Sequence, residues 1–427
     1  MQERVVLVGG GGREHAIAGA LADTELYAYS SNRNPGIAAL ATEVRTGSET
    51  DTEAIVDFAT EVEATLAVIG PEAALAAGVV DALEAVGIFA FGPTAEQARL
   101  ETDKAYQREF MAEHGIEAGP EFATFQEVEP AIEHLESVEG DVAVKPRGLT
   151  GGKGVRVTGD QLSKGEAVEY LRESGYDEWV IEERLLGEEF TVQAFVANGE
   201  VRPTLAVQDH KRAYEGDEGP NTGGMGSYSD TGPVLPFMTE ADYEAAVAVL
   251  EETVDALEDY RGVLYGQFML TAEGPKVVEY NVRFGDPEAM NTLPVLETDF
   301  LDVLVAARED ESLPELEFSG QATVCKYAVP AGYPVAPEAG TKVSVDVDAA
   351  PETELFYASV DERADGLYTT TSRSFAVLGL GDSIDAAESR AEAALSNVGE
   401  GFHVRHDIGT AELVNSRIEH MQAVRGE

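Results

Sequence analysis

The stretch RVVLVGGGGREHA, residues 4–16, joins an apolar strand, four consecutive glycines and the start of a helix. The first hundred residues repeat this alternation: the strand signals LYAYS, LAVIG and IFAFG follow in turn, with helical segments from about Arg13, Asp51 and Glu72. Strands that alternate with helices are typical of a parallel sheet covered by helices on both faces. The stretch therefore predicts an N-terminal doubly wound α/β domain.

The glycine turn, Gly9 to Gly12, leads directly into the helix, so bare amides and the positive helix end favour a phosphate group. A dinucleotide site fits less well, because Glu14 stands where G-x-G-x-x-G has its third glycine. The second strand also ends in SSNRN, without the acid that binds a ribose. A small phosphate ligand is favoured, and a tight turn without a ligand is the alternative.

Length and composition favour a multidomain globular enzyme. The chain has 427 residues, of which 44% are hydrophobic, enough for two to four domains with cores. No run approaches the roughly 20 apolar residues of a membrane span, and no signal-like segment precedes the first strand, so we expect a cytoplasmic protein. The single cysteine, Cys325, lies in the apolar stretch ATVCKYAV and is expected to be buried.

The charge is strongly acidic, with 80 Asp and Glu against 29 Lys and Arg and a formal net charge of −51. The acids run through every expected helix, so the charge belongs to the whole surface. Molar salt shortens the Debye length to about 3 Å and removes most of the self-repulsion. We therefore expect a halophilic protein; an acidic protein that binds a basic partner is the alternative. A nucleic acid is a poor candidate for a partner, because binding its phosphates requires a basic surface.

Salt dependence gives a first prediction. The melting temperature should rise steadily with KCl concentration, because added cations screen the repulsion between surface carboxylates. Thermal melting at increasing KCl concentrations measures the effect. A melting temperature that fails to rise with salt would contradict the halophilic interpretation.

In so acidic a chain, cations that gather near glycines are informative, because positive charge beside bare amides binds phosphate. Lys145 ends the strand DVAVKP and can meet an α- or β-phosphate, and the following RGLTGGKGVRV can fold Lys153 over the outer phosphates. This segment is not a Walker loop, because no Ser or Thr follows Lys153. A flexible hairpin without a ligand is the alternative.

The stretch WVIEERLLGEEFTVQAFVANGEVRP predicts an antiparallel hairpin that turns at Asn198-Gly199. Its IEERLLG can serve as a hinge against which an adenine lies, with Glu182 and Glu189 accepting from the amino group or the ribose hydroxyls. Ordinary surface glutamates are the competing interpretation. The next segment, QDHKRAYEGDEGPNTGGMGSYS, has no periodicity and collects scarce cations beside glycines, so it predicts a long substrate loop.

The stretch EYNVRFGDPE, residues 279–288, closes an apolar strand with carboxylates, an amide and a guanidinium. Glu279 and Asn281 are two positions apart and share one face of the strand, and Gln267 of the neighbouring strand can reach the same side. Oxygen ligands of this kind suit Mg²⁺ or Mn²⁺. With one charged ligand of three, the predicted site is weak and fills when a nucleotide brings its own oxygens; a plain amphipathic strand is the alternative.

Taken together, these motifs resemble the ATP-grasp ligases, and among them the glycinamide ribonucleotide synthetase family. The motifs that carry the resemblance span nearly the whole chain: VGGGGREHA, GLTGGKGV, IEERLLGEEFT, QDHKR, GPNTGGMGSYS, EYNVRFGDPE and the late GLYTTTSRSFAVLGLGDS. The resemblance implies a Rossmann-like domain over residues 1–100, an ATP-grasp domain over 101–317 with a lid subdomain at about 120–190, and a C-terminal α+β domain over 318–427.

The resemblance implies an ATP-dependent ligation of glycine to 5-phosphoribosylamine in purine synthesis, with Mg²⁺ or Mn²⁺. It implies neither a nucleic-acid nor a membrane partner, and a monomer or weak homo-oligomer. An acyl phosphate route needs no protein nucleophile, which fits a site of Lys, Arg, glycines and metal. Another ATP-grasp ligase or carboxylase, or a non-catalytic nucleotide-binding protein, are the alternatives.

The site residues follow from the same motifs. Those expected to bind ATP are Lys104, Lys145, Lys153, Glu182, Glu183, Leu185 and Glu189. The expected metal ligands are Gln267, Glu279 and Asn281. The expected catalytic residues are Lys211, Arg283, Asp286 and His210, with Asp286 and His210 as candidate general bases. The expected substrate-binding residues are Gly10, Gly11, Gly12, Arg13, Asp209, Arg212, Asn221, Thr222, Gly223, Gly224, Met225, Gly285 and Pro287.

Two positions depart from the family pattern. Arg147 stands where many members have an aspartate, and Gln267 stands where a glutamate is common, which would weaken metal binding in the absence of ATP. From about Phe318 the sequence predicts strands and one late helix, DSIDAAESRAEAALSNV, as an α+β cap. His403 and His406 are expected to be surface or cap residues, not a metal pair.

Overall fold

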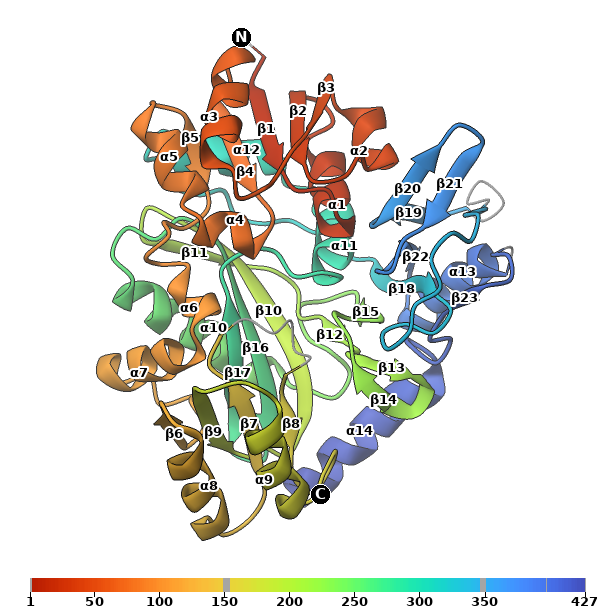
Figure 1. Cartoon of the computed structure of the whole chain (residues 1–427). Helices are drawn as coiled ribbons and strands as arrows, with labels where there is room; N and C mark the ends of the chain where they lie inside the picture. The colour runs from red at the N-terminus through yellow and green to blue at the C-terminus, as the bar shows by residue number, and fades with distance from the viewer. Residues whose placement is uncertain (1, 149–153, 346–350, 397, 427) are drawn as a thin grey trace.

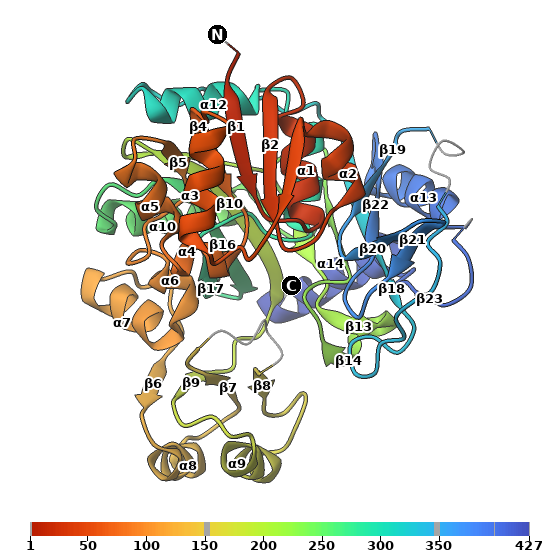
Figure 2. The same ribbon diagram turned by 45° about the horizontal axis from the view of Figure 1, so that its top comes forward.

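The computed structural model describes residues 2–148, 154–345, 351–396 and 398–426. Figure 1 shows a parallel sheet at the top, an antiparallel sheet in the middle, a smaller sheet with two helices at the bottom and the C-terminal sheet at the right. The smaller sheet and its helices project from the rest of the molecule in Figure 2. The predicted multidomain α/β and α+β architecture is confirmed.

The N-terminal sheet has five parallel strands in the order β3-β2-β1-β4-β5. The strand order reverses at β1, and ligands bind beyond the carboxyl ends of the strands at such a point. The strands are β1 (Arg4–Val8), β2 (Glu25–Ser30), β3 (Glu43–Thr46), β4 (Leu66–Ile69) and β5 (Phe89–Phe91). The helices are α1 (Gly12–Ala20), α2 (Pro35–Leu40), α3 (Thr52–Glu61), α4 (Glu72–Ala76) and α5 (Val79–Ala85).

Three features of this domain differ from the prediction. The elements α2 and β3 were not expected, because β3 is short and half-exposed and carries no run of apolar residues. The helix expected from Glu72 is divided in two at Gly78, whose φ of +81° lies in the left-handed region that favours glycine.

Two helices, α6 (Arg99–Thr102) and α7 (Lys104–His114), lead into a unit that we call the small unit, residues 122–183. Its antiparallel sheet has the order β6-β9-β7-β8 and a core of its own around Trp179. The elements are β6 (Phe122–Phe125), α8 (Val128–Ser137), β7 (Val142–Pro146), β8 (Arg156–Val157), α9 (Lys164–Glu173) and β9 (Trp179–Glu183).

The central antiparallel sheet has the order β11-β10-β16-β17. The predicted hairpin is confirmed, since β10 (Glu188–Ala197) pairs with β11 (Glu200–Pro203) across Asn198 and Gly199. The strands β16 (Gly262–Thr271) and β17 (Gly274–Asn281) form a second hairpin. The helix α10 (Glu240–Ala256) packs on this sheet, and α11 (Glu288–Thr292), a 3₁₀ turn η2 (Leu293–Val295) and α12 (Phe300–Arg308) follow β17.

The segment expected to be a long loop, residues 208–229, is built into sheets instead. It contains β12 (Gln208–Asp209), β13 (Arg212–Tyr214), a 3₁₀ turn η1 (Glu215–Asp217), β14 (Glu218–Asn221) and β15 (Gly226–Ser229). β15 pairs with β18 (Ala322–Pro330), and the close approach of Gly226 to the carbonyl of Cys325 leaves no room for a Cβ. Glycine-rich strands that pair through the backbone give no alternation of apolar residues, so the sequence did not reveal them.

The C-terminal sheet therefore runs β12-β15-β18-β22-β19 and crosses the boundary expected near residue 318. Its further strands are β19 (Thr353–Tyr357), β22 (Phe375–Gly381) and β23 (Phe402–His403), and β20 (Val360–Arg363) pairs with β21 (Gly366–Thr369) as a separate hairpin. Cys325 lies in β18 and is buried, as expected.

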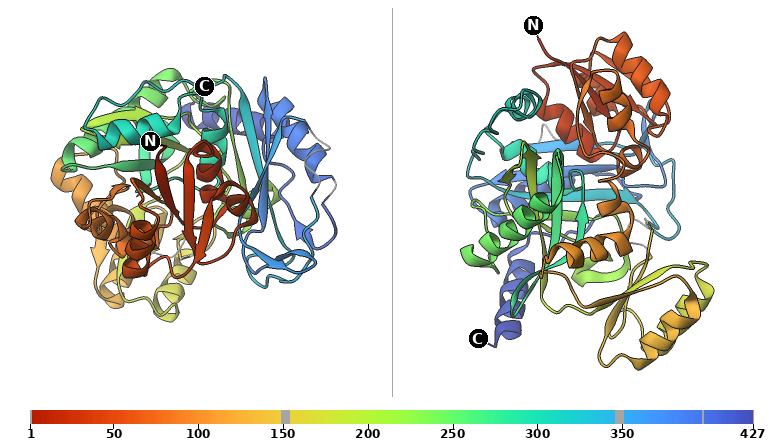
Figure 3. Two further views of the ribbon diagram at one scale, coloured as in Figure 1. Left: turned by 90° about the horizontal axis from the view of Figure 1, so that it is seen from above. Right: turned by 90° about the vertical axis from the view of Figure 1, so that its left-hand side faces the viewer.

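Two helices complete this end of the chain. The expected late helix is α13 (Ile384–Leu395), and a second helix, α14 (Ala411–Arg425), was not predicted. The helix α14 leaves the C-terminal sheet and packs against β10 and β16, where Leu413, Val414 and Met421 join the core of the central sheet. Figure 3 shows this helix, which ends at the C-terminus, and the small unit projecting from the same end of the molecule. Among the described residues, no helix is both long and apolar enough to span a membrane.

Candidate active site

A cavity of about 480 Å³, which we call the larger cavity, lies between the small unit and the central sheet. Residues from β7, the hinge between β9 and β10, β12, β13, β17 and α14 line it. It brings together Lys145, Glu182, Glu183, Leu185, Glu189, Asp209, His210, Lys211, Arg212, Asn221 and Glu279 from the predicted set. Residues that are distant in sequence, and that were predicted to bind ATP, the substrates or the metal or to act in catalysis, thus line one cavity.

A buried ion triad stands at one wall of the larger cavity. The Glu182 carboxylate accepts from Arg108 Nε at 2.7 Å and Arg108 Nη2 at 3.2 Å, and it pairs with Lys145 Nζ at 2.7 Å. Burial raises the pKa of Glu182, but the charges of Arg108 and Lys145 outweigh it and lower that pKa overall. The Glu182 carboxylate is therefore already engaged, which differs from the expectation that it accepts from an adenine.

Lys104 and Arg147 are linked through the start of α7. Arg147 donates to both oxygens of Asp103, at 2.8 and 2.7 Å, and Asp103 caps α7 by accepting from the Tyr106 amide. Lys104 Nζ donates to the Gly148 carbonyl at 2.9 Å, and burial lowers the pKa of Lys104. The cation at position 147 thus fixes the helix end that carries Lys104, because its partner is the cap of that helix.

The predicted metal ligands lie together on the central sheet. Gln267 of β16 pairs directly with Glu279 of β17, and Asn281 is two residues further along the same face. Lys211 Nζ donates to Gln267 Oε1 at 2.5 Å and lies 3.6 Å from Glu279 Oε1. Gln267 Nε2 donates to Glu189 Oε2 at 2.6 Å, which connects the predicted ribose-binding residue to this group.

Positive charge dominates the surroundings of Glu279. Burial raises the pKa of this carboxyl, but Lys211, Lys104 and Lys145 together outweigh burial and lower the pKa to about 2. Burial lowers the pKa of Lys211, while Glu279 and Asp209 outweigh it and raise that pKa overall. The group therefore holds a carboxylate and an ammonium in their charged forms. Two amide oxygens and one carboxylate on neighbouring strands are donors of the kind that a hard divalent cation takes.

Of the two residues that precede Lys211, His210 is buried and Asp209 is half-buried. Burial raises the pKa of Asp209 to about 8 and lowers the pKa of His210 to about 3. Neither ring nitrogen of His210 has a hydrogen-bond partner in the described part of the chain. No hydrogen bond from the described residues orients this ring, so the geometry does not support His210 as a general base.

A second cavity of about 120 Å³, which we call the smaller cavity, opens where the N-terminal, central and C-terminal parts meet. It is lined by Gly10, Gly11, Asn32, Asp286, Ala358, Ser359, Ser372 and Arg373. A Cβ at Gly10 would lie 2.5 Å from Asn32 Oδ1, so the backbone there approaches the wall closely. Of the predicted residues, Gly10, Gly11 and Asp286 line this cavity.

Arg373 joins three segments at the smaller cavity. Its Nη2 pairs with Asp286 Oδ2 at 3.0 Å, and its Nη1 donates to the carbonyls of Gly223 at 2.6 Å and Gly224 at 3.0 Å. The guanidinium also stacks 4.3 Å from the ring centre of Tyr327. Asp286 in turn accepts from the Tyr327 hydroxyl at 2.7 Å. Arg373 therefore fixes the GPNTGGMG segment against the turn that contains Asp286.

Arg13 and Arg283 belong to a buried ion cluster between the two cavities. Arg13 donates to Glu14 Oε1 at 2.6 Å and to the Phe284 carbonyl at 3.2 Å, and it does not line the smaller cavity. Arg283 pairs with Glu101 at 2.7 Å and donates to Asn281 Oδ1 at 3.3 Å. In this structure Arg13 is thus occupied by protein partners, which differs from a direct contact with a phosphate.

The remaining predicted residues support the loop between these groups. Thr222 donates to the Lys211 carbonyl at 2.8 Å and accepts from the Gly224 amide at 3.0 Å. The Gly285 amide donates to Gln193 at 2.7 Å. Gly12 faces Tyr327, Met225 is fully buried, and Pro287 lies against Gly224. Lys153 lies outside the described residues, with the rest of residues 149–153.

Sequence reasoning missed several residues that line the two cavities. Arg373 and Ser372 lie in GLYTTTSRS, where a scarce cation between polar residues was a usable signal. Arg417 and His420 lie on the helix that was not predicted and line the larger cavity. Their spacing of three on one helix was visible in the sequence, but nothing in it tied that helix to the central sheet.

Comparisons with known proteins show which family this chain belongs to. Family models described as phosphoribosylglycinamide synthetase match residues 3–101 (N domain), 102–289 (ATP-grasp domain) and 323–411 (C domain). The chain is 52% identical over 442 residues to the phosphoribosylamine–glycine ligase of Methanosarcina acetivorans, covering 100% of this chain and 99% of the relative. It is 50% identical over 439 residues to that of Methanosarcina barkeri, covering 99% and 100%. The crystal structure of phosphoribosylamine–glycine ligase from Thermotoga maritima matches with a TM-score of 0.80 and 29% identity, covering 95% of this chain and 99% of that one.

Proposed function

The chain belongs to the phosphoribosylglycinamide synthetase family, and on this premise we propose where its ATP and its two substrates bind. It is an ATP-dependent ligase of purine biosynthesis that joins glycine to 5-phosphoribosylamine, giving glycinamide ribonucleotide, ADP and phosphate. We assign the nucleotide to the larger cavity and the phosphoribosyl group to the smaller one. We also place domain boundaries near residues 100 and 317, with residues 120–190 as a lid.

The chemistry needs activation of a carboxylate. The γ-phosphoryl group moves from ATP to an oxygen of the glycine carboxylate, which gives ADP and glycyl phosphate. The amine of phosphoribosylamine then attacks the acyl carbon, phosphate leaves, and the amine loses a proton. No protein nucleophile is required, so the residues act by holding the reactants and by stabilising negative charge.

The single observation that carries the ATP assignment is the meeting of Lys145, Lys211 and Glu279 around one cavity with the hinge. Lys104 and Lys145 are placed to hold the phosphates, and residues 182–185 line the larger cavity where an adenine would lie. Glu189 is placed for ribose hydroxyls, because its carboxylate lies beside Gln267 at the cavity wall.

A divalent metal fits the oxygen donors of the central sheet. Gln267, Glu279 and Asn281 would hold Mg²⁺ or Mn²⁺, which would neutralise charge on the transferring phosphoryl group. Lys211 lies between Gln267 and Glu279 and supplies a second positive charge to the same place. The single carboxylate in this donor set fits a site completed by the oxygens of the nucleotide.

The smaller cavity suits a phosphorylated sugar. The backbone at Gly10, the start of α1 and the Arg373 guanidinium are groups that bind a phosphate, and Ser359 and Ser372 add hydroxyls, while the Gly11 amide donates to Glu14 Oε2 at 2.7 Å. Asp286 lies at the same cavity and is held by Arg373 and Tyr327, so it is the remaining candidate to accept the amine proton.

A prediction follows for Arg373. Its replacement by alanine should raise the KM for phosphoribosylamine about 10-fold to 100-fold, because a charge-assisted contact is lost. Steady-state kinetics with each substrate varied in turn measure the change. Arg363→Ala is the matched control, since Arg363 forms an exposed ion pair with Asp361 away from both cavities. A KM for phosphoribosylamine equal to that of the control would contradict the assignment.

The proposed function is tested by ADP release with each substrate omitted in turn, at a KCl concentration that stabilises the fold. Rapid ADP release is expected only with ATP, glycine and phosphoribosylamine together. Rapid release with a different acid and amine would indicate another ATP-grasp ligase. Nucleotide binding without ADP release for any pair would indicate a non-catalytic binding protein.

A further inference from the structure

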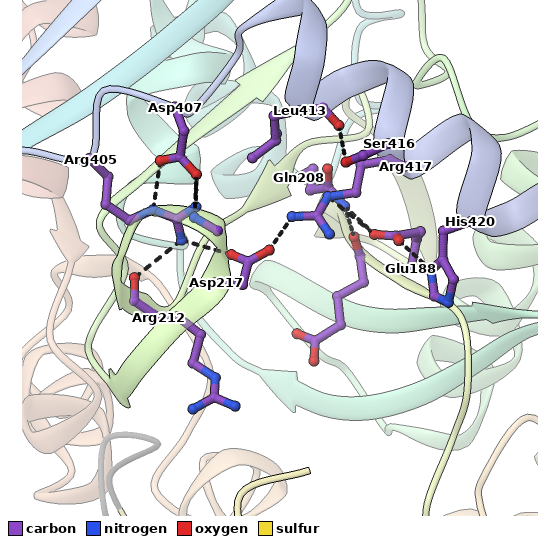
Figure 4. A network of polar contacts seen from close by, with 12 residues as sticks. Glu188, Gln208, Arg212, Asp217, Arg405, Asp407, Leu413, Ser416, Arg417 and His420 are labelled. Carbon is purple, nitrogen blue, oxygen red and sulfur yellow. Dashed lines mark hydrogen bonds and ion pairs between the residues drawn. The ribbon is translucent and has the colours of Figure 1, made fainter.

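The C-terminal helix α14 forms part of the wall of the larger cavity. Its apolar side, with Leu413, Val414 and Met421, is buried in the core of the central sheet, and α14 packs against β10 and β16. Its other side carries Arg417 and His420 into the lining of the larger cavity. Figure 4 shows Arg417 directed between Asp217 and Glu188. A helix from the end of the chain thus reaches the proposed nucleotide site.

Arg417 contacts two acids from different walls of the cavity. Its Nη2 pairs with Asp217 of the turn between β13 and β14, and its Nε lies 3.5 Å from Glu188 Oε2 at the start of β10. The side chain of Arg417 is 20% exposed and that of Glu188 is 6% exposed. Salt screens ion pairs at this depth less than pairs at the surface, so they persist in the high salt that we expect this protein to need.

Asp217 holds the tip of the hairpin that we call the β13–β14 hairpin, residues 212–221. Its φ of +57° is in the left-handed region, which costs energy for a residue other than glycine. Arg405 Nη1 binds the second carboxylate oxygen at 2.7 Å, and Asp407 pairs with Arg405 and accepts from the Gly216 amide at 3.0 Å. The C-terminal part of the chain therefore keeps the tip in one conformation through both oxygens of Asp217.

The β13–β14 hairpin carries residues of the proposed site. It begins directly after Lys211, whose ammonium contacts Gln267, and its Arg212 and Asn221 line the larger cavity. Arg212 also pairs with Asp160 of the small unit at 2.8 Å. A displacement of the hairpin tip would therefore move groups that face the phosphates.

Glu188, the second acid that Arg417 contacts, connects Arg417 to residues beside the hinge between β9 and β10. Gln208 donates to Glu188 Oε2 at 3.2 Å and to the Glu189 carbonyl at 3.0 Å, and His420 Nδ1 lies 2.6 Å from Glu188 Oε1. Glu189 follows directly in the chain and is the residue proposed to hold the ribose. The position of Arg417 thus affects two walls of the larger cavity, the β13–β14 hairpin and the start of β10.

We propose that Arg417 is a positioning residue for the ligase reaction, because it joins the β13–β14 hairpin, through Asp217, to the start of β10, through Glu188. The inference rests on the proposed function, since it takes the larger cavity as the nucleotide site. Arg417 acts through these partners and does not transfer phosphoryl groups or protons. The C-terminal helix is accordingly a part of the catalytic unit.

The same helix supplies a matched control. Arg425 has a side chain that is also 20% exposed, and its Nη2 lies 2.8 Å from both oxygens of Asp242 on α10. Arg425 and Asp242 do not line either cavity. Both arginines attach α14 to the central part of the chain, and Arg417 alone of the two faces the proposed site.

The experiment compares Arg417→Ala, Arg417→Lys and Arg425→Ala by melting temperature, nucleotide binding and steady-state kinetics. We expect Arg417→Ala to raise the KM for ATP and the Kd for ADP about 10-fold to 100-fold, because charged contacts are lost. Arg417→Lys should recover part of the loss, since an ammonium retains one of the two ion pairs. Arg425→Ala should lower the melting temperature to a similar extent and leave both constants unchanged.

A second variant keeps the test valid if Arg417→Ala does not fold. Asp217→Asn removes the paired charge, while asparagine tolerates the left-handed conformation. It should also raise the KM for ATP, and the combination with Arg417→Lys should be non-additive. Equal kinetics for the Arg417 and Arg425 variants, or strict additivity with Asp217→Asn, would overturn the positioning role. Absence of ADP release from the unaltered chain would instead contradict the proposed function.

Discussion

The Glu279→Gln variant is expected to lose on the order of 100-fold to 1,000-fold in kcat, comparable to the loss of one group that stabilises a transition-state charge. Glu279 is the only acidic member of the proposed metal set, and its pKa of about 2 keeps it ionised at any working pH. Glutamine keeps the size of the side chain and removes its charge. The loss should therefore affect turnover far more than folding.

A control on the same hairpin separates charge from position. Glu273 lies in the turn between β16 and β17, away from both cavities, and Glu273→Gln makes the same change of charge. Coupled ADP assays over a range of Mg²⁺ and Mn²⁺ concentrations, with melting temperatures of both variants, provide the comparison. Near-normal kcat for Glu279→Gln at low metal concentration would remove Glu279 from the metal site.

The second large effect concerns stability. Glu182→Ala should lower the free energy of unfolding by about 3–5 kcal/mol, the usual cost of removing one partner of a buried ion pair. The change leaves Arg108 and Lys145 buried, with the Val278 carbonyl as the remaining partner that both of them contact. Glu182→Gln should cost less, because its amide oxygen can still accept from Arg108.

The chain contains its own reporter for this measurement. Trp179 is the single tryptophan of the sequence, and it is buried in the small unit on the same strand as Glu182. Urea unfolding at constant KCl, followed by tryptophan fluorescence, therefore reports on the small unit. Glu183→Ala is the control, since Glu183 is the exposed neighbour on β9. A midpoint for Glu182→Ala equal to that of the control would show that the triad does not stabilise this unit.

The sequence predicted those parts of the fold that a pattern of side chains marks, such as an apolar run or a turn dipeptide. Strands such as β1 and β16 have nearly continuous apolar runs, and the Asn198-Gly199 turn is a strong local signal for a hairpin. The strands β12 to β15 pair through the backbone of polar and glycine residues, so periodicity could not reveal them. The helix α14 was not predicted: Val414, Ile418 and Met421 recur at helical spacing, but the strands that bury them lie far away in the chain.

The candidate site was predictable where a residue type is rare in this sequence. In an acidic chain, Lys104, Lys145 and Lys211 stood out as scarce cations, and the structure places Lys145 and Lys211 at one cavity with Lys104 nearby. The partners of individual side chains were not predictable. Glu182 forms an ion pair with Arg108, and Arg147 forms one with Asp103. Each of these pairs depends on how elements that are distant in the sequence pack together.

The shared sheet has a consequence for dividing this protein into parts. β15 lies between β12 and β18, so the last hundred residues complete a sheet that the preceding residues begin. A fragment ending near residue 317 would lose β18 and leave one side of β15 with unpaired amide and carbonyl groups. Open strand edges of this kind promote aggregation. We therefore expect the two fragments to be insoluble when produced separately, and to regain solubility when they are synthesised together in one cell.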